Sequence, residues 1–427
     1  MSSAATSRLR RRSREGSDTD RKLAFLDHPL ADYTLLLIFT LALLGIGLVM
    51  VFSASSVESI AGSGSIFSQF QKQFFAALIG VPAMLWLSRR PLHFFVRAAP
   101  ILMIVALVLL VLVLIPGIGV NIGGQQNWIR MPGGFNLQPS EIGKLALALW
   151  GARLLSMRSG SWDNWRAVTL PFLPMAALVV VLVLLEGDVG TALVFMPMIA
   201  VMLLIVGIPL RFFVATGSVL LLLIAYMSLT EGYRMQRFAT WLNPEADPTG
   251  AGWQVIHGRM ALATGGWWGV GLGASREKWG SLPEAHNDFI FAIIGEELGL
   301  IGTILVMALF LFVGLVGIRI ARRTHSLFVR LATVAIVAWI VTQSVINIGA
   351  VIGTMPVTGV PLPLVSYGGT SLVLTLCAMG VLLAFARQEP AAAATIRARA
   401  LQRRRMKRVS QVRRAGHGAD RTATTAQ

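Results

Sequence analysis

The sequence has 427 residues, of which 55% are hydrophobic and only 13% are charged. A soluble globular domain carries roughly 25% charged residues, so this composition excludes that class of protein. Continuous apolar runs of about twenty residues recur along the chain, which predicts an all-α polytopic membrane protein and excludes a transmembrane β-barrel, whose strands alternate apolar and polar positions.

The formal net charge of +17 is concentrated in two terminal tails. Basic runs often bind nucleic acid, but in a membrane protein they are typical of cytoplasmic tails held against anionic lipid, and we expect no nucleic-acid partner. We therefore predict a basic tail over residues 1–31, a transmembrane domain over residues 32–387 and a disordered basic tail over residues 388–427.

Hydropathy predicts about ten membrane spans in chain order. They begin near Tyr33, Phe70, Val96, Pro139, Arg166, Val189, Leu210, Asp288, Leu327 and Ser366. Lysine and arginine gather in alternate short loops, and the positive-inside rule then places both termini in the cytoplasm. The other loops are predicted to lie outside, over residues 121–136, 186–188, about 230–287 and 353–365. ATP is absent from that side of the membrane, so no nucleotide cofactor is expected.

The predicted helix that starts near residue 288 has a carboxylate, Asp288, at its N-terminal end. An Asp before Phe-Ile-Phe-Ala is a good helix N-cap, but an acid at a membrane surface is also a functional-site hypothesis, as a general base or a metal ligand. The two roles are compatible. Glu284, His286 and Asn287 lie in the same turn, where His286 is either a proton carrier or, as we expect, an exposed loop residue.

A second charged pair opens the span near residue 139. Pro139 fits the first turn of a helix, and Glu141 and Lys144 are three residues apart, so they share a helix face. One interpretation is a local ion pair at the helix start. The other, which we favour, is a charged pair that faces the interior of the helix bundle, because charges next to hydrocarbon usually face protein or a cavity.

The long outer loop carries basic residues and many glycines. Its cations indicate an anionic ligand such as a phosphate or diphosphate, and they are Arg234, Arg237, Arg259, Arg276 and Lys278. Glycines at 265, 266, 269, 271 and 273 allow close backbone approach. Trp267 and Trp268 between them are interpreted first as membrane-interface anchors and second as a sugar-stacking platform.

Proline and glycine recur from Pro356 to Gly369 and predict irregular backbone at the membrane surface, which is tolerated where protein buries it or where it lines a cavity. Ser366 and Tyr367 lie at the end of this segment. Gln343 and Asn347, four apart in the preceding helix, form a polar stripe for which we expect interhelical hydrogen bonds.

Four of these stretches together resemble the SEDS family (shape, elongation, division and sporulation), and the resemblance covers about residues 32–387. They are residues 138–144, 188–191, 283–297 and 361–369. The resemblance implies ten helices and a peptidoglycan glycosyltransferase that polymerises lipid II outside the cytoplasmic membrane, with the essential acid at Asp288. Residues 50–55 and the basic tails resemble the division branch of the family more than the elongation branch.

The implied chemistry is an inverting glycosyl transfer. Asp288 would deprotonate the acceptor sugar's 4-hydroxyl, which attacks the anomeric carbon of an undecaprenyl-diphosphate-linked glycan. The departing diphosphate needs stabilisation by basic side chains or by a divalent Mg²⁺ or Mn²⁺ ion, for which Asp288 is a candidate ligand. The expected substrate-binding residues are Glu141, Lys144, Arg237, Lys278, Glu284, His286, Ser366 and Tyr367.

Two other functions remain open at this point, a lipid II flippase and a noncatalytic scaffold of the division complex. No repeated halves are visible, which argues against a transporter. The resemblance further implies a class B penicillin-binding transpeptidase and other divisome proteins as partners, at the division septum.

Overall fold

The computed structural model describes residues 28–63, 67–122, 125–131, 135–158, 170–211, 213, 217–218, 222, 239–250, 252–279, 282–396, 398 and 402. The chain divides into two units, residues 1–34 with 386–427, and residues 35–385. The second unit contains the candidate site. Most of the two predicted tails lies outside the described residues.

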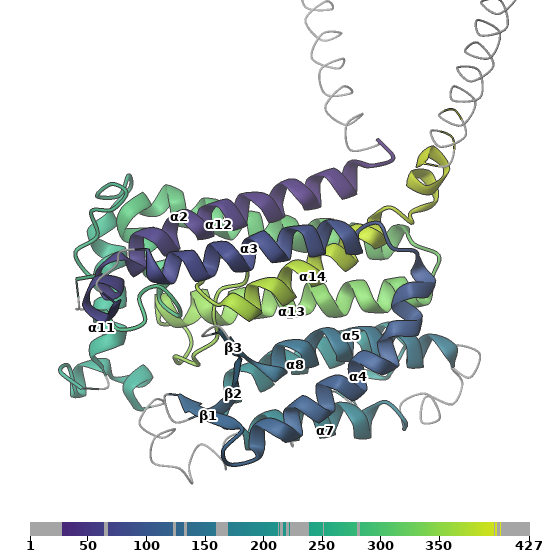
Figure 1. Cartoon of the computed structure of the whole chain (residues 1–427), viewed down its shortest axis with the longest axis horizontal. Helices are drawn as coiled ribbons and strands as arrows, with labels where there is room; N and C mark the ends of the chain where they lie inside the picture. Colours follow the sequence, from purple (N-terminus) through teal and green to yellow (C-terminus); the bar gives the residue numbers. More distant parts are fainter. Residues whose placement is uncertain are drawn as a thin grey trace, which may run out of the picture. The chain divides into compact units, whose positions relative to one another are not determined.

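Helices dominate the described residues (Figure 1). Six of them are long and apolar enough to cross a membrane, namely α2 (Ala31–Ser63), α3 (Ser68–Leu87), α4 (Leu92–Leu114), α12 (Ile290–Arg323), α13 (Leu327–Ile352) and α14 (Gly369–Ala386). The other α-helices of the described residues are α5 (Pro139–Met157), α7 (Leu173–Leu185), α8 (Val189–Ile205) and α11 (Trp253–Gly265). Every predicted span thus has a helical counterpart, except the one near Leu210, which lies mostly outside the described residues.

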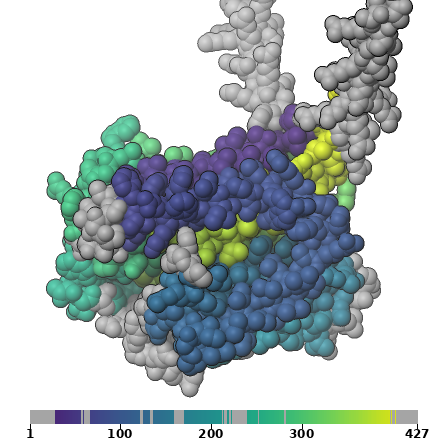
Figure 2. All heavy atoms as spheres, in the orientation of Figure 1, coloured from purple at the N-terminus to yellow at the C-terminus, as the bar shows by residue number. Residues whose placement is uncertain are grey.

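Helix α13 is the central helix of this arrangement, because it packs against α5, α8 and α12 (Figure 1). Its side chains are buried around most of its circumference, and Trp339 is fully enclosed. Helix α4 instead leaves a row of large apolar side chains exposed, among them Ile101, Ile104 and Val108. Helices α3 and α4, in blue, form much of the face drawn in Figure 2. Exposed apolar rows of this kind suit a helix that contacts lipid.

One region predicted as a loop contains a small sheet. Strands β1 (Gly119–Ile122), β2 (Gln125–Met131) and β3 (Phe135–Leu137) pair antiparallel in the order β1-β2-β3. The fold is therefore not purely helical. Hydropathy cannot find such short strands, although the Gly-Gly and Pro-Gly-Gly stretches between them are typical of hairpin connections.

The loops predicted to share one side of the membrane do meet at one end of the second unit. The backbone N–H of Gln126 donates to the Glu186 carbonyl (3.1 Å), and the Thr370 hydroxyl donates to the Asn136 carbonyl (2.8 Å). The Trp241 indole donates to a carbonyl at residue 353 (3.0 Å). We call this region the loop-rich end, and it comprises the described residues of the ranges 115–138, 186–188, 239–289 and 353–368.

Helix α12 is broken at Gly299, whose φ of 67° and ψ of −165° are not helical. In an unbroken helix the N–H groups of Leu300 and Ile301 would donate to carbonyls four residues earlier. Here they donate to the carbonyls of Gly266 (2.9 Å) and Trp267 (3.4 Å). The glycine-rich segment (residues 265–273) therefore replaces one turn of helical hydrogen bonding.

The carbonyls released by the break are satisfied by the same segment. The N–H of Val270 donates to the Glu296 carbonyl (2.9 Å), and the N–H of Gly271 donates to the Glu297 carbonyl (3.1 Å). Gly269, at a φ of 78°, approaches the Glu297 backbone so closely that no side chain fits there. The prediction that these glycines permit close backbone approach is confirmed for Gly265 and Gly269, whereas a Cβ at Gly266, Gly271 or Gly273 would meet no atom within 4 Å.

Replacing Gly299 with Ala should destabilise the protein strongly. The backbone conformation alone costs a non-glycine residue about 1–3 kcal/mol, and a Cβ would lie 2.6 Å from the Trp267 carbonyl oxygen. The measurement is the thermal midpoint in detergent. Gly45→Ala is the matched control, because a Cβ at Gly45 meets no atom within 4 Å. Equal midpoints for the two variants would contradict a structural role for the break.

Candidate active site

The Asp288 turn precedes α12 and is shaped by its own backbone. Glu284 has a φ of 54°, and its carbonyl accepts hydrogen bonds from the N–H groups of Asn287 (3.0 Å) and Phe289 (3.3 Å). The N-cap residue of α12 is Phe289, with no side-chain cap bond, so the predicted capping role of Asp288 is wrong. The Asp288 side chain is half-buried, and its Oδ2 faces Gly359, where a Cβ would lie 3.7 Å away.

Helix α13 holds the backbone of this turn against the Pro- and Gly-rich loop. The Asn347 amide nitrogen donates to the carbonyl oxygens of Asp288 and Val360, both at 2.9 Å. Asn347 thus bonds loop carbonyls rather than another helix, which corrects the expectation for this residue. One side chain therefore ties the backbone of the Asp288 turn to the loop that contains Val360.

Ser366 and Tyr367, both predicted site residues, bind the other side of the turn. The Ser366 hydroxyl donates to the Asn287 carbonyl (2.7 Å), and the Tyr367 N–H donates to the His286 carbonyl (3.0 Å). The rings of His286 and Tyr367 lie 5.3 Å apart. His286 is buried, so the expectation of an exposed loop histidine is wrong. The tyrosine ring and the protein around it cover the imidazole.

Gln73 on α3 is a site residue that sequence analysis missed. Its amide nitrogen donates to the Ser366 carbonyl (3.0 Å), and its amide oxygen accepts from the Gly368 N–H (3.1 Å). The available signal was a glutamine next to Phe74 and Phe75 in an apolar span, since a polar side chain there needs a partner inside the protein.

The predicted interior position of Glu141 and Lys144 is confirmed. The Lys144 Nζ lies 2.8 Å from Glu141 Oε1, and both side chains are completely buried. Lys144 also donates to the Gln343 amide oxygen (2.7 Å), and Gln343 donates to the Pro361 carbonyl (2.8 Å). This chain of contacts links α5 through α13 to the irregular loop beside Asp288, and it includes the interhelical bond expected of Gln343.

Lys278 belongs to a separate buried cluster. Its Nζ lies 3.1 Å from Glu297 Oε1 and 3.1 Å from the Ser53 hydroxyl, which itself donates to Glu297 (2.6 Å). The neighbouring Glu296 carboxylate accepts from the Ser275 hydroxyl (2.5 Å) and the Arg276 N–H (2.8 Å). Two carboxylates of α12 therefore hold the loop that leads to the Asp288 turn.

Asp188 and Glu186, in the turn between α7 and α8, have opposite surroundings. Asp188 accepts from Thr191 N–H (2.9 Å), Thr191 hydroxyl (2.7 Å), Gln138 (2.9 Å) and Asn127 (3.3 Å). Glu186 is also buried, but neither of its carboxyl oxygens has a hydrogen-bond partner among the described residues. Burial, followed by the neighbouring Asp188 charge, raises the pKa of Glu186 to about 9. Glu186 is therefore neutral at pH 7.

The remaining predicted site residues are Glu284 and Arg237. Glu284 is exposed, and its carboxylate is 3.5 Å from the Asn287 amide nitrogen. Arg237 lies outside the described residues. Within the part of the chain that the structure describes, no group of three or more His, Cys, Asp or Glu side chains could hold a metal ion.

Comparison with known proteins decides the family. A family model described as Cell cycle protein, covering FtsW, RodA and SpoVE, matches residues 34–390. The chain belongs to this family, which is the SEDS family. It is 40% identical over 375 residues to the probable peptidoglycan glycosyltransferase FtsW of Mycobacterium tuberculosis, which covers 88% of this chain and 71% of that protein.

Solved structures agree with the family. One chain of a peptidoglycan synthase complex, described as coordinating polymerization and crosslinking, superposes with a TM-score of 0.67 and 29% identity, covering 83% of this chain and 97% of its own. The rod shape determining protein RodA of Thermus thermophilus gives a TM-score of 0.60 and 27% identity, covering 83% of this chain and 96% of its own. The helical membrane fold predicted from sequence is thus confirmed.

Breaking the Glu141–Lys144 pair should unfold the protein more readily than removing both charges. Lys144→Met leaves a buried unpaired carboxylate, which typically costs about 3–5 kcal/mol, whereas the Glu141→Gln/Lys144→Met double variant should regain most of that loss. Thermal midpoints in detergent measure both. Lys72→Met, at an exposed position, is the control and should behave like wild type. A double variant as unstable as the single one would show that packing, not charge, is at stake.

Glu186→Gln should stabilise the protein in a pH-dependent way. The pKa of Glu186 is about 9 in the folded protein against 4.5 in the unfolded chain, so the folded state holds more protons between these values. The stability that the protonated Glu186 side chain contributes is fully present below pH 4.5 and is lost as the pH rises towards 9. Glutamine does not titrate, so the variant's advantage should grow from pH 5 to pH 8.

The readout is the difference in thermal midpoint between Glu186→Gln and wild type at each pH. A gain of about 1 kcal/mol would raise the midpoint by roughly 1 °C in a chain of this length. Glu245→Gln, an exposed position, should leave the pH profile unchanged. A difference that is constant with pH would contradict the raised pKa.

Proposed function

We propose that the chain is a peptidoglycan glycosyltransferase that polymerises lipid II into glycan strands at the outer face of the cytoplasmic membrane during septal cell-wall synthesis. Membership of the SEDS family and similarity to a probable peptidoglycan glycosyltransferase FtsW support this proposal. The observation that carries it is the half-buried carboxylate of Asp288, whose backbone is fixed by Asn347 and whose turn is fixed by Ser366.

Asp288 is proposed as the general base. A carboxylate that takes the proton of the acceptor hydroxyl accelerates the transfer by about 10²–10⁴-fold, provided that it is held within hydrogen-bond reach of that hydroxyl. Backbone and side-chain hydrogen bonds hold the turn on both sides, which fixes the backbone from which the carboxylate projects. The carboxylate faces Gly359, where a Cβ would lie 3.7 Å from Oδ2, so no side chain from that position covers it.

The cation that stabilises the leaving diphosphate must come from outside the two buried pairs. Lys144 and Lys278 are each neutralised by a glutamate and are shielded from solvent. We propose that they position the loops rather than bind substrate. Arg259, exposed on α11 and lying against Gly353, is a better-placed candidate for the diphosphate among the described residues.

A divalent cation can bind at Asp288 only if the substrate supplies most of the ion's ligands. Mg²⁺ is commonly held by one or two carboxylates together with substrate phosphates, and Asp288 is the carboxylate available at this place. Bound there, Mg²⁺ or Mn²⁺ would neutralise negative charge on the diphosphate.

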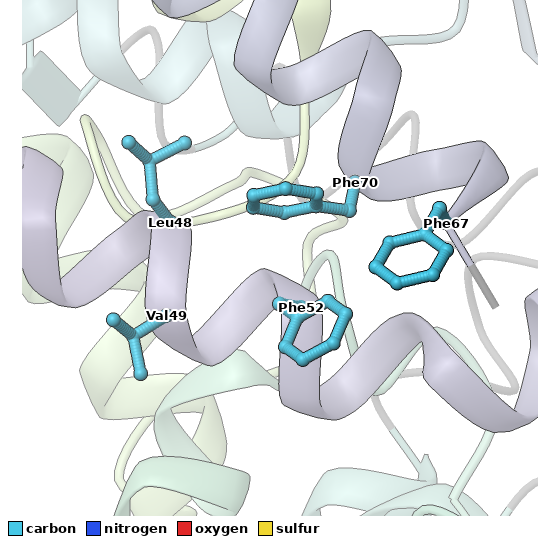
Figure 3. A pocket seen from close by; sticks show the side chains of 5 residues that line it. All are labelled: Leu48, Val49, Phe52, Phe67 and Phe70. Atoms are coloured by element: carbon cyan, nitrogen blue, oxygen red, sulfur yellow. The ribbon is translucent and has the colours of Figure 1, made fainter.

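The lipid part of the substrate requires apolar surface. A hollow of about 260 Å³ opens between α2 and the start of α3, and only apolar side chains line it (Figure 3). They are Leu48, Val49, Phe52, Phe67 and Phe70. Phe52 precedes Ser53 of the Lys278 cluster, so the hollow lies close to the loop-rich end. A polyprenyl chain is the kind of ligand that fits such a lining.

The proposed partners follow from the relatives. The synthase complex is described as joining polymerization to crosslinking, which supports a class B penicillin-binding transpeptidase as the partner that crosslinks the strands. Similarity to FtsW supports a role in division, for which we propose the divisome and the septum as the setting. The alternation of Lys and Arg between loops favours cytoplasmic termini.

Asp288→Asn should abolish glycan synthesis while the protein stays folded, because the amide cannot accept the proton. Purified protein is given lipid II without any other polymerase, and products are separated by size. The expected loss is at least about 100-fold. Asp247→Asn makes the same change at an exposed position of the same loop region and should retain activity.

The same assay separates the other functions. Lipid movement across the bilayer without glycan chains from the wild-type protein would indicate a flippase, and neither activity would indicate a scaffold. Glycan synthesis by Asp288→Asn at the wild-type rate would exclude the proposed base.

A further inference from the structure

The glycine-rich segment presents a dense group of exposed apolar side chains. Trp267 is 70% exposed and Trp268 is 82% exposed, and Val270 and Leu272 beside them are exposed as well. Trp279, a few residues later, is 69% exposed. A cluster of this kind in contact with water is costly and marks a surface that binds something.

The position of the segment is fixed by α12. The carbonyls of Gly266 and Trp267 accept from the first N–H groups after the break at Gly299. Gly269 lies against the helix backbone at the same place. The tryptophans therefore cannot move far from the level of the break.

The environment of α12 changes at that level. From Ile290 to Glu297 every residue is buried. From Leu300 onward a row of large side chains is exposed, which contains Leu300, Ile301, Ile304, Leu305, Leu311, Phe312, Leu315 and Ile318. An exposed apolar row on a membrane-spanning helix contacts lipid, so lipid contact begins directly after the break.

The length of the second part of α12 supports this boundary. From Leu300 to Ala321 the helix has a length of about 33 Å at 1.5 Å per residue, which matches the roughly 30 Å of bilayer hydrocarbon. Arg322 and Arg323 follow at the far end. Basic residues at one end and tryptophans at the other are the usual anchors at the two membrane interfaces.

We propose that residues 266–272 are seated in the headgroup layer of the leaflet at the loop-rich end, with Trp267, Trp268 and Leu272 inserted into lipid. The partner is a lipid surface rather than a protein, because the segment continues the lipid-facing row of α12. Indole rings suit this layer, since they combine a large apolar body with one N–H donor.

When residues 266–272 are inserted in this way, they set the depth in the membrane of the loop that leads to Asp288. The backbone that follows the tryptophans binds the Glu296 and Glu297 carbonyls, and the side chains of the same glutamates hold Ser275 and Lys278. This loop continues into the Asp288 turn. The bilayer thus positions the reacting carboxylate relative to the headgroups from which a lipid-linked substrate projects.

Spin labels at single cysteines test the proposal. In a Cys377→Ser background, labels are placed at 268 and 272, at 304 as a lipid reference and at 247 as a water reference, with the protein in nanodiscs of phosphatidylethanolamine and phosphatidylglycerol. Power saturation with oxygen and with a water-soluble nickel chelate gives the depth of each label. Labels at 268 and 272 should lie between the references, with nickel accessibility at least about twofold below that at 247.

Two outcomes would overturn the proposal. One is nickel accessibility at 268 and 272 equal to that at 247. The other is protection that arises only when a purified class B transpeptidase is added, which would make the segment a protein interface. If the label at 268 prevents folding, the label at 272 decides.

A second measurement needs no label. Trp267→Ala/Trp268→Ala should keep the wild-type thermal midpoint in detergent but lose activity several-fold in nanodiscs relative to detergent. This readout rests on the proposed function, whereas the spin-label result does not, so the two can fail separately. Equal activity ratios for the variant and the wild type would contradict the anchor's role in placing the loop.

Discussion

Backbone polar groups at membrane depth must find partners inside the protein, because lipid offers none. The chain leaves helical geometry twice next to the candidate site, at Gly299 and in residues 353–368. At the first break the glycine-rich segment supplies matching N–H and carbonyl groups. At the second, the amides of Gln73, Gln343 and Asn347 bind the irregular backbone. The position of Asp288 depends on these hydrogen bonds, which replace those of a regular helix.

The same constraint governs the buried charges. Lys144 and Lys278 each face a glutamate, and Asp188 is surrounded by donors. Glu186 has no such partner among the residues that the structure describes, and it keeps its proton instead. A buried ion pair adds little net stability but enforces one arrangement of the groups it joins. Here the pairs join α5 to α13 through Gln343, and α2 to α12 through Ser53, so they fix the helices that surround the site.

The sequence predicted the helices but not the contacts between distant segments, and its choice of Asp288 as the acid stays a prediction. Apolar runs are a local signal, and they placed α12 and α13 well. The burial of Glu141 and Lys144 could be predicted because charges beside hydrocarbon must face inward. The kink at Gly299 was missed, since one glycine in an apolar run has no distinct pattern. Gln73 and the burial of His286 were missed as well, because their partners are about 293 and 81 residues away in sequence, at Ser366 and Tyr367.

The distribution of charge at the loop-rich end limits how the reaction can be stabilised. Hydrogen bonds from the Asn347 amide, the Ser366 hydroxyl and backbone groups hold the backbone of the Asp288 turn. The described lysines nearby are already paired, so they cannot follow a diphosphate as it departs. Positive charge for that step must be exposed and adjustable, as Arg259 is, or must arrive with the substrate as a bound cation. Under the proposed function, fixed hydrogen bonds hold the turn that carries the base, and a mobile cation serves the leaving group, so the two tasks fall to different groups.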